Sequence, residues 1–247
     1  MNRSILISLG LAVVVALGAI FYILQPSGGG VGGQPGSTGE EFRFSFAEFD
    51  DFQPIHQPAS FEEFMTPHWT DTAYGDPEAP VVMVEYFSYA CPHCRDFHQG
   101  TYQQILADYV DAGLVYFVKR DFLLNSRSVG FELLAGAGAQ CFQDSAQSQA
   151  FADQVFAQQR ALTANPNPAE ALVPVFMAAG MEEAMARSCM AEHRNRSLVF
   201  GRSLRAAEIG TVTGTPTIFI NGEKYAGSSG NYNEMRRAIE LALALNS

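Results

Sequence analysis

The chain has 247 residues and a formal net charge of −11, with 26 acidic against 15 basic residues. This acidic balance argues against nucleic-acid binding, which requires a basic face. Hydrophobic residues make up 47% of the sequence and charged residues 17%, so the chain can bury a sizeable core and disorder is not expected. The length suits one large domain or two small ones.

The N-terminal segment, residues 1–24, predicts export from the cytoplasm. An uncharged apolar run extends from Ile5 to Leu24, behind a positive flank at Arg3. A helix over such a run spans about 30 Å, the thickness of the hydrocarbon core of a bilayer. Because a cleaved signal peptide has a shorter apolar core, we favour a transmembrane anchor over a signal sequence and keep both open. In either case the positive flank stays cytoplasmic and the rest is exported.

Two segments separate this run from the regular part of the chain. Residues 25–39 contain clustered glycines and two prolines, the composition of a flexible linker. Residues 40–74 are an extension rich in phenylalanine, which we expect to pack on the domain rather than to act as a flexible arm in a hydrophobic groove. Within it, Ser60 and Glu63 can form a capping box at the start of a short helix.

From Gly75 onward, the pattern predicts regular secondary structure. An apolar run over 81–87 predicts a buried strand, followed by a helix over 92–110 and a second strand over 114–119. Residues 122–205 are mostly helical in composition.

Asn221-Gly222 then separates two short runs, 217–220 and 223–226, which we expect to pair as a hairpin, and 232–245 reads as an amphipathic helix. Strand, helix and strand, followed by a hairpin and a helix, is the thioredoxin pattern. We therefore predict an α/β protein with a thioredoxin-like fold and an inserted α-helical domain, divided as 75–121 (first part), 122–205 (insertion) and 206–247 (second part).

The turn between the first strand and helix carries Cys91-Pro92-His93-Cys94. A thiolate attacks disulfides, and the free N–H groups and positive dipole end of a helix stabilise an anion at Cys91. Pro92 suits the first helical position, and His93 adds stabilisation if it is protonated or donates a hydrogen bond. We predict that Cys91 is the nucleophile, with an accessible sulfur, and that the more buried Cys94 resolves the mixed disulfide.

The stretch from Glu85 to Cys94, EYFSYACPHC, resembles the active-site segment of the DsbA family of bacterial thiol:disulfide oxidoreductases. The resemblance extends from about Gly75 to the C-terminus. It implies an enzyme that oxidises thiols of exported polypeptides without a metal or organic cofactor, and a DsbB-like, quinone-linked membrane protein that reoxidises it. We expect it at the periplasmic face of the bacterial inner membrane, anchored by residues 5–24, or soluble in the periplasm after signal cleavage.

Gly214-Thr215-Pro216-Thr217 follows the cysteine pair by about 120 residues and resembles the cis-proline loop of that family. The match implies that the Thr215 backbone lies beside the disulfide and pairs with an extended substrate. The alternative is an ordinary trans-proline at a strand edge.

Glu85 and Lys119 each lie in an otherwise apolar strand, where a charge is costly unless it is paired. They match a buried acid and a basic residue that flank the disulfide in the DsbA family. A buried carboxyl group has a raised pKa and is suited to accept the Cys94 proton. The alternative is a pair at the strand ends that reaches solvent.

Cys141 and Cys189 both fall in the helical insertion, 48 positions apart. They are a second redox pair, a structural disulfide of the kind found in a subset of the DsbA family, or two unpaired thiols; we favour the structural disulfide. Their wide spacing argues against a zinc site, which needs a second close pair, so we predict no metal. The remaining histidines give no clear signal and are predicted to be surface or packing residues: His56, His68, His98 and His193.

Two other classes of function stay open. A reductase or isomerase of the same fold would keep the Cys91–Cys94 pair reduced. A non-catalytic metal-binding or chaperone module is the less favoured alternative.

Overall fold

The computed structural model describes residues 60–68, 70–124 and 128–246, all within one compact unit, 41–247. The predicted anchor or signal sequence (1–24), the linker (25–39) and the phenylalanine-rich residues before 60 lie outside the described residues. No helix in the described ranges is long and apolar enough to cross a membrane.

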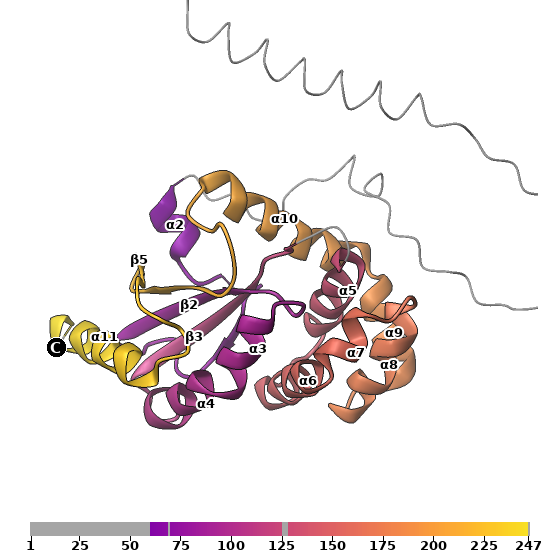
Figure 1. Ribbon diagram of the computed structural model, residues 1–247, viewed down its shortest axis with the longest axis horizontal. Coiled ribbons are helices and arrows are strands. Elements are labelled where there is room, and N and C mark those ends of the chain that lie inside the picture. The colour runs from indigo at the N-terminus through magenta and orange to yellow at the C-terminus, as the bar shows by residue number, and fades with distance from the viewer. Residues whose placement is uncertain (1–59, 69, 125–127, 247) are drawn as a thin grey trace, which may run out of the picture. The chain divides into compact units, whose positions relative to one another are not determined.

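A mixed sheet of five strands forms the centre of the thioredoxin-like part (Figure 1). Its order is β1-β3-β2-β4-β5, in which β2 and β3 are parallel and the other neighbouring pairs are antiparallel. The strands are β1 (Thr72–Tyr74), β2 (Val81–Phe87), β3 (Val115–Asp121), β4 (Thr217–Ile220) and β5 (Glu223–Lys224). This topology confirms the predicted thioredoxin-like fold.

The sheet differs from the prediction at its edges. It begins at Thr72, three residues before the expected start of the thioredoxin-like part, because β1 pairs with β3. At the other edge, β5 has two exposed residues instead of the four expected. The predicted turn is present, since Asn221 and Gly222 both have positive φ angles, 47° and 83°, as a tight hairpin turn requires.

Helices cover the sheet and form a separate block beside it. The predicted helix over 92–110 is interrupted at Gly100, where φ is −121° and ψ is −95°. The described helical segments of the thioredoxin-like part are α2 (Phe61–Met65), α3 (Pro92–Gln99), α4 (Thr101–Ile105), the π-helical turn η2 (Leu106–Val110) and α11 (Tyr232–Leu245). Ser60 caps α2 as predicted, because its hydroxyl oxygen accepts a hydrogen bond from the Glu63 N–H.

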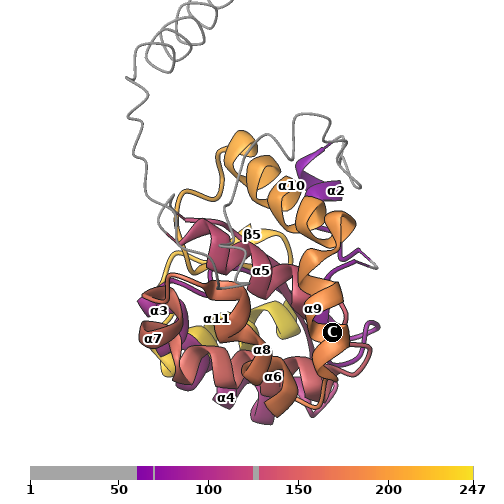
Figure 2. The same ribbon diagram turned by 90° about the vertical axis from the view of Figure 1, so that its right-hand side faces the viewer.

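The insertion is helical, as predicted, but its last helix extends past residue 205. Its helices are α5 (Val129–Ala139), α6 (Ser145–Ala157), α7 (Gln159–Thr163), α8 (Pro168–Ala178), α9 (Glu183–Ala191) and α10 (His193–Ile209). Figures 1 and 2 show α5 to α9 gathered beside the sheet, whereas α10 runs back over one of its faces.

Period-two alternation along the strands divides the sheet core into two layers. On one face Met83 and Phe117 pack with residues of α4 and α11. On the other, Val84 and Val118 pack with residues of α2 and α10 (Figure 1). Glu85 and Lys119 follow Met83 and Phe117 by two positions, so they extend the first face.

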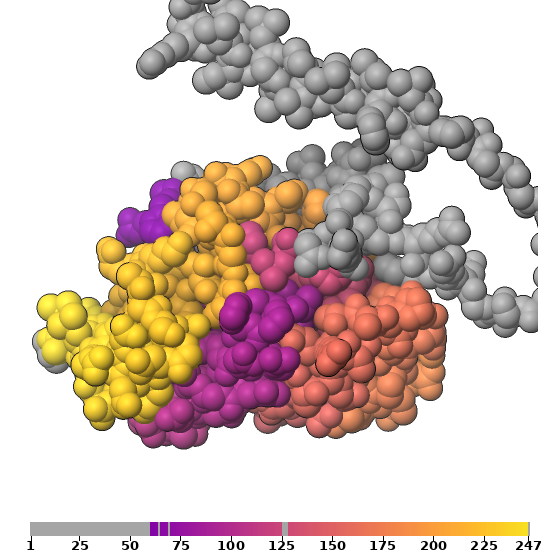
Figure 3. Space-filling model, viewed as in Figure 1, coloured from indigo at the N-terminus to yellow at the C-terminus, as the bar shows by residue number. Residues whose placement is uncertain are grey.

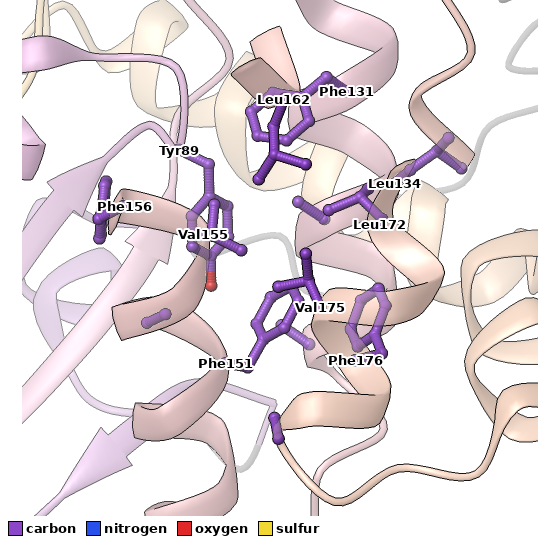
Figure 4. Packing of buried hydrophobic residues seen from close by; sticks show 14 of the residues in the cluster. Tyr89, Phe131, Leu134, Phe151, Val155, Phe156, Leu162, Leu172, Val175 and Phe176 are labelled. Atoms are coloured by element: carbon purple, nitrogen blue, oxygen red, sulfur yellow. The ribbon is translucent and has the colours of Figure 1, made fainter. Parts of the chain in front are cut away.

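The helical block has its own core, which reaches the turn between β2 and α3. Phe151 of α6 stacks on Phe176 of α8 with ring centroids 4.1 Å apart. Tyr89, in the turn, packs against Phe151 and Phe156 at 5.8 and 5.6 Å (Figure 4). The space-filling view shows the purple residues of α3 and α4 packed against the orange residues of the helical block (Figure 3).

Cys141 and Cys189 form a disulfide that links the segment after α5 to α9, with Cα atoms 6.1 Å apart. The alternative of two unpaired thiols is therefore wrong, and that the bridge is structural rather than a second redox pair remains a prediction. Because both sulfurs are bonded to each other, neither can serve as a zinc ligand beside Cys91 and Cys94.

The loss of this bridge should destabilise the protein. A crosslink that closes a 48-residue loop is worth roughly 4 kcal/mol on the chain-entropy model. We expect Cys141→Ser/Cys189→Ser to lower the free energy of unfolding in urea by about that amount. Wild-type protein with the bridge chemically reduced is the control and should match the variant; equal stability of the bridged and unbridged proteins would contradict the prediction.

Candidate active site

Cys91 caps the N-terminus of α3, directly after the turn that leaves β2. Its N–H donates to the Ser88 carbonyl at 3.1 Å, and Pro92 occupies the first turn, as the sequence predicted. Both cysteines are free thiols. Cys94 is fully buried and Cys91 is 4% exposed, so the predicted nucleophile is less open to solvent than expected.

The two cysteines have opposite pKa shifts. A hydrogen bond from the Cys94 thiol, aided by the backbone N–H groups of His93 and Cys94, lowers the pKa of Cys91 from 9.0 to about 5, although burial opposes this. Burial raises the pKa of Cys94 well above 9.0, and the neighbouring Cys91 and Glu85 add to the rise. The reduced site therefore holds one thiolate and one thiol at neutral pH. The His93 side chain is exposed, and His93 lowers the pKa of Cys91 through its backbone N–H.

The loop before β4 reaches the same site from the C-terminal part of the chain. The Thr215–Pro216 peptide bond is cis, as predicted. In the thiol form, Cys91 donates a hydrogen bond to the Thr215 carbonyl at 3.3 Å. The expected proximity of the Thr215 backbone to the nucleophile is therefore present; its pairing with a substrate remains a prediction.

Glu85 and Lys119 face each other in the register of β2 and β3. Their side chains are 1% and 3% exposed, so the alternative of a pair that reaches solvent is wrong. The Lys119 Nζ lies 3.7 Å from Glu85 Oε2, longer than a hydrogen bond. Burial raises the pKa of Glu85, and Lys119 opposes this rise. A protonatable carboxyl group thus lies near Cys94, although proton transfer between them remains a prediction.

His98, predicted to be a surface or packing residue, is 1% exposed and packs against Tyr102 and Phe156, but its polar contacts at the site were not predicted. Its Nδ1 lies 3.2 Å from Lys119 Nζ, and its Nε2 lies 2.7 Å from Asp153 Oδ1 on α6. One signal was available, because His98 follows Cys94 by four positions and so shares its helix face.

Gln159 on α7 is a residue that the sequence analysis missed. Its amide nitrogen donates to the carbonyls of Tyr89 and Cys91, at 2.8 and 2.9 Å. Gln159 belongs to the helical block, so this block fixes the backbone of the active-site turn through a buried side chain. No sequence pattern marks it, since the contact spans about 70 positions.

A family model described as "Thioredoxin" matches residues 68–241. The chain belongs to the thioredoxin family. A Rickettsia bellii (strain RML369-C) protein named "Putative protein-disulfide oxidoreductase" is 24% identical over 173 residues, which cover 70% of this chain and 64% of that protein. "Disulfide bond formation protein D" of Bacillus subtilis (strain 168) is 22% identical over 176 residues, 68% of this chain and 75% of that protein.

The chain spans 60 to 64% of the length of three Rickettsia relatives. Among solved structures, alpha-DsbA1 of Wolbachia pipientis superimposes with a TM-score of 0.69 at 22% identity, over 76% of this chain and 98% of that chain. Oxidised BdbD of Bacillus subtilis superimposes with a TM-score of 0.62 at 21% identity, over 71% of this chain and 94% of that chain. This chain therefore has the fold of the DsbA structures, including their helical insertion.

The ionisation of Cys91 should be visible in the reduced protein. We expect the ultraviolet absorbance of the thiolate to rise with a midpoint at about pH 5. Because the Cys94 thiol is the largest cause of the shift, Cys94→Ala should move the midpoint upward, and Cys94→Ser, which keeps a hydroxyl donor, should move it less. A wild-type midpoint close to 9.0 would contradict the assignment.

The same shift predicts how stability depends on pH. The folded-state pKa of Cys91 lies below its unfolded value, so its stabilisation is full above pH 9.0 and is lost as pH falls to about 5. The difference in unfolding free energy between the reduced wild type and Cys91→Ala should grow across this window. A difference that stays constant with pH would argue against a stabilised thiolate.

Proposed function

We propose that this protein is a DsbA-like thiol:disulfide oxidoreductase, which introduces disulfide bonds into exported proteins through a Cys91–Cys94 disulfide. The observation that carries the proposal is a free Cys91–Cys94 pair at the N-terminus of α3, where hydrogen bonds lower the pKa of Cys91 to about 5 and burial raises the pKa of Cys94. A stable reduced form makes the corresponding disulfide a strong oxidant. The fold and the names of the similar proteins support the same activity.

The reaction follows from the two pKa shifts. A substrate thiolate attacks the Cys91 sulfur of the oxidised site, and the sulfur–sulfur bond breaks with its electron pair on Cys94. Cys94 takes up a proton, since its thiol form is strongly favoured. A second substrate thiolate then attacks the substrate sulfur of the mixed disulfide, and Cys91 leaves as a thiolate. Two substrate thiols are oxidised, and the enzyme disulfide is reduced by two electrons.

Leaving-group chemistry favours this direction. In thiol–disulfide exchange, a thiol of lower pKa leaves faster. Cys91 has the lower pKa of the pair, so release of the oxidised substrate is the favoured outcome of the mixed disulfide. Glu85 is buried next to the pair and is suited to give Cys94 its proton in this direction and to take it back on reoxidation.

The remaining parts of the proposal concern the surroundings of the enzyme. An extracytoplasmic location is supported by the Cys141–Cys189 disulfide, because such bonds persist in oxidising compartments. We propose that reduced exported polypeptides are the substrates and that a DsbB-like quinone oxidoreductase of the membrane reoxidises the site. We propose that the Thr215 backbone, whose carbonyl lies 3.3 Å from the Cys91 sulfur, pairs with an extended substrate segment. Attachment to the membrane through residues 5–24, or cleavage of that segment, belongs to the same proposal.

The activity can be tested with a reduced two-cysteine peptide and stoichiometric oxidised enzyme. We expect rapid peptide oxidation by wild type and no oxidation by Cys91→Ser or Cys94→Ser, because neither variant can form the Cys91–Cys94 disulfide that accepts the two electrons. Cys141→Ser/Cys189→Ser, purified in folded form, is the matched control and should retain the reaction.

The equilibrium of the Cys91–Cys94 pair with glutathione separates this proposal from a reductase. We expect a reduction potential well above the roughly −270 mV of thioredoxin. A potential as low as that of thioredoxin would overturn the oxidase proposal in favour of a reductase. Metal analysis of the purified protein addresses the binding-module alternative.

A further inference from the structure

The ammonium group of Lys119 lies between two acceptors and is closer to one of them. Its Nζ is 3.2 Å from His98 Nδ1 but 3.7 Å from Glu85 Oε2. Neither carboxylate oxygen of Glu85 has a hydrogen-bond partner among the described residues, although Glu85 is buried. The lysine is thus hydrogen-bonded to the imidazole nitrogen of His98 rather than to the carboxyl group of Glu85.

The position of Asp153 explains why His98 can accept this bond. A carboxylate only accepts hydrogen bonds, so the His98 Nε2, 2.7 Å from Asp153 Oδ1, carries the proton. The Nδ1 lone pair of the neutral ring is then free for the Lys119 ammonium. Burial, followed by the charge of Lys119, lowers the pKa of His98 to about 4, so the ring is neutral at physiological pH.

Packing fixes the His98 ring and the lysine in this arrangement. The ring stacks on Tyr102 with centroids 5.0 Å apart. The Lys119 Nζ lies 4.6, 4.8 and 5.6 Å from the ring centroids of Phe87, Tyr102 and Phe156. These aromatic faces stabilise the ammonium charge without competing for its hydrogen bonds.

We propose that His98, oriented by Asp153, is a positioning residue that holds the Lys119 ammonium away from Glu85 and so leaves that carboxyl group ready to exchange a proton with Cys94. This inference deepens the proposed function and rests on it for the role of Cys94. His98 touches no reacting atom; it acts through Lys119.

The physical reason is a competition for one cation. At direct hydrogen-bond distance, a buried ammonium strongly favours the charged form of a carboxylate. Such a carboxylate is a weak base and a poor partner for a thiol of raised pKa. With Lys119 drawn toward His98, burial remains the largest effect on Glu85, and its pKa stays raised.

Several other titratable groups face this cluster, and one of them is a second buried carboxyl group. Burial raises the pKa of Asp121, also on β3, to about 6, while Lys119 lowers it. The tyrosines nearby have raised pKa values and stay protonated. The groups that face Glu85, Lys119 or His98 are Cys91, Cys94, Tyr74, Tyr89, Tyr102, Asp121 and Asp153.

Two substitutions of His98 separate its two nitrogens. In His98→Asn, the short amide places an oxygen near the former Nδ1 and retains an acceptor for Lys119. In His98→Gln, the longer amide reaches toward Asp153 but leaves the Nδ1 position empty. Both variants remove the ring, so a role in packing alone would affect them alike.

The readout is the ionisation of the Glu85 carboxyl group in the reduced protein, followed by carbon-13 NMR. Glu85→Gln assigns the signal, and a parallel series in Asp121→Asn removes the overlapping group. We expect His98→Gln to lower the pKa of Glu85 by about one unit or more, since an opposite charge in contact shifts a carboxyl by that order. His98→Asn should stay close to wild type.

Substitutions of Asp153 also separate variants that keep an acceptor from variants that remove it. The Asp153 side chain is 49% exposed, so its substitution is less disruptive to folding. Asp153→Ala removes the acceptor that fixes the His98 tautomer and should lower the pKa of Glu85, as His98→Gln does. Asp153→Asn keeps an oxygen acceptor and should not. Equal titrations in all four variants and wild type, or equal shifts within each matched pair, would overturn the inference.

The kinetic consequence is measured separately. The rate at which Cys94 closes the mixed disulfide between Cys91 and a peptide should fall severalfold at neutral pH in His98→Gln and Asp153→Ala, with a pH profile that follows the Glu85 titration. If wild type oxidises no peptide while the NMR pattern holds, the proposed function fails and the positioning by His98 stands. If oxidation proceeds and the NMR pattern is absent, the positioning fails alone.

Discussion

The hydrogen bonds that converge on the Cys91 sulfur are the interaction on which the rest of the site depends. They come from the Cys94 thiol and from backbone N–H groups at the start of α3. The backbone donors are available because the chain turns from β2 into a helix at Cys91, and Pro92, which has no N–H, suits the first position of that helix. The placement of that helix is in turn fixed by burial of Phe97 against the sheet.

Three distant parts of the chain meet at this helix end. The Thr215 carbonyl arrives from the loop before β4, and the Gln159 amide arrives from the helical block. The core of the helical block also includes both active-site cysteines and Tyr89. The insertion is therefore part of the active site, because it supplies both its apolar wall and a bond to its backbone.

The local features of the site could be predicted from sequence because they depend on short-range patterns. The apolar run of β2, the proline after Cys91 and the Asn-Gly turn each act within a few residues, and they appear in the structure as expected. Strand β1 could not be predicted, since three residues carry no clear alternation and pair with β3 across about 45 positions. Gln159 was missed for the same reason, because its partners lie about 70 positions away.

For Glu85 and Lys119, the family resemblance predicted more than the residue pattern alone, because it predicted their place beside the disulfide. Two charges in apolar strands predict a pair, and the register of parallel strands β2 and β3 brings them opposite each other. The pattern does not reveal that the ammonium has a second acceptor, because Asp153 belongs to the insertion and His98 gave no compositional signal.

Buried ion pairs contribute little net stability, since desolvation offsets most of their attraction. Within the part of the chain that the structure describes, no group donates a hydrogen bond to either carboxylate oxygen of Glu85, and Lys119 Nζ is 3.7 Å away, so the pair lacks the contact that would compensate for burial. The arrangement is therefore difficult to explain as a device for stability. It is reasonable as a device for chemistry, because a destabilised carboxylate readily takes up a proton. Helix α3 connects the two halves of that chemistry: its first turn sets the charge of the Cys91 sulfur, and its last turn, through His98, sets the position of Lys119.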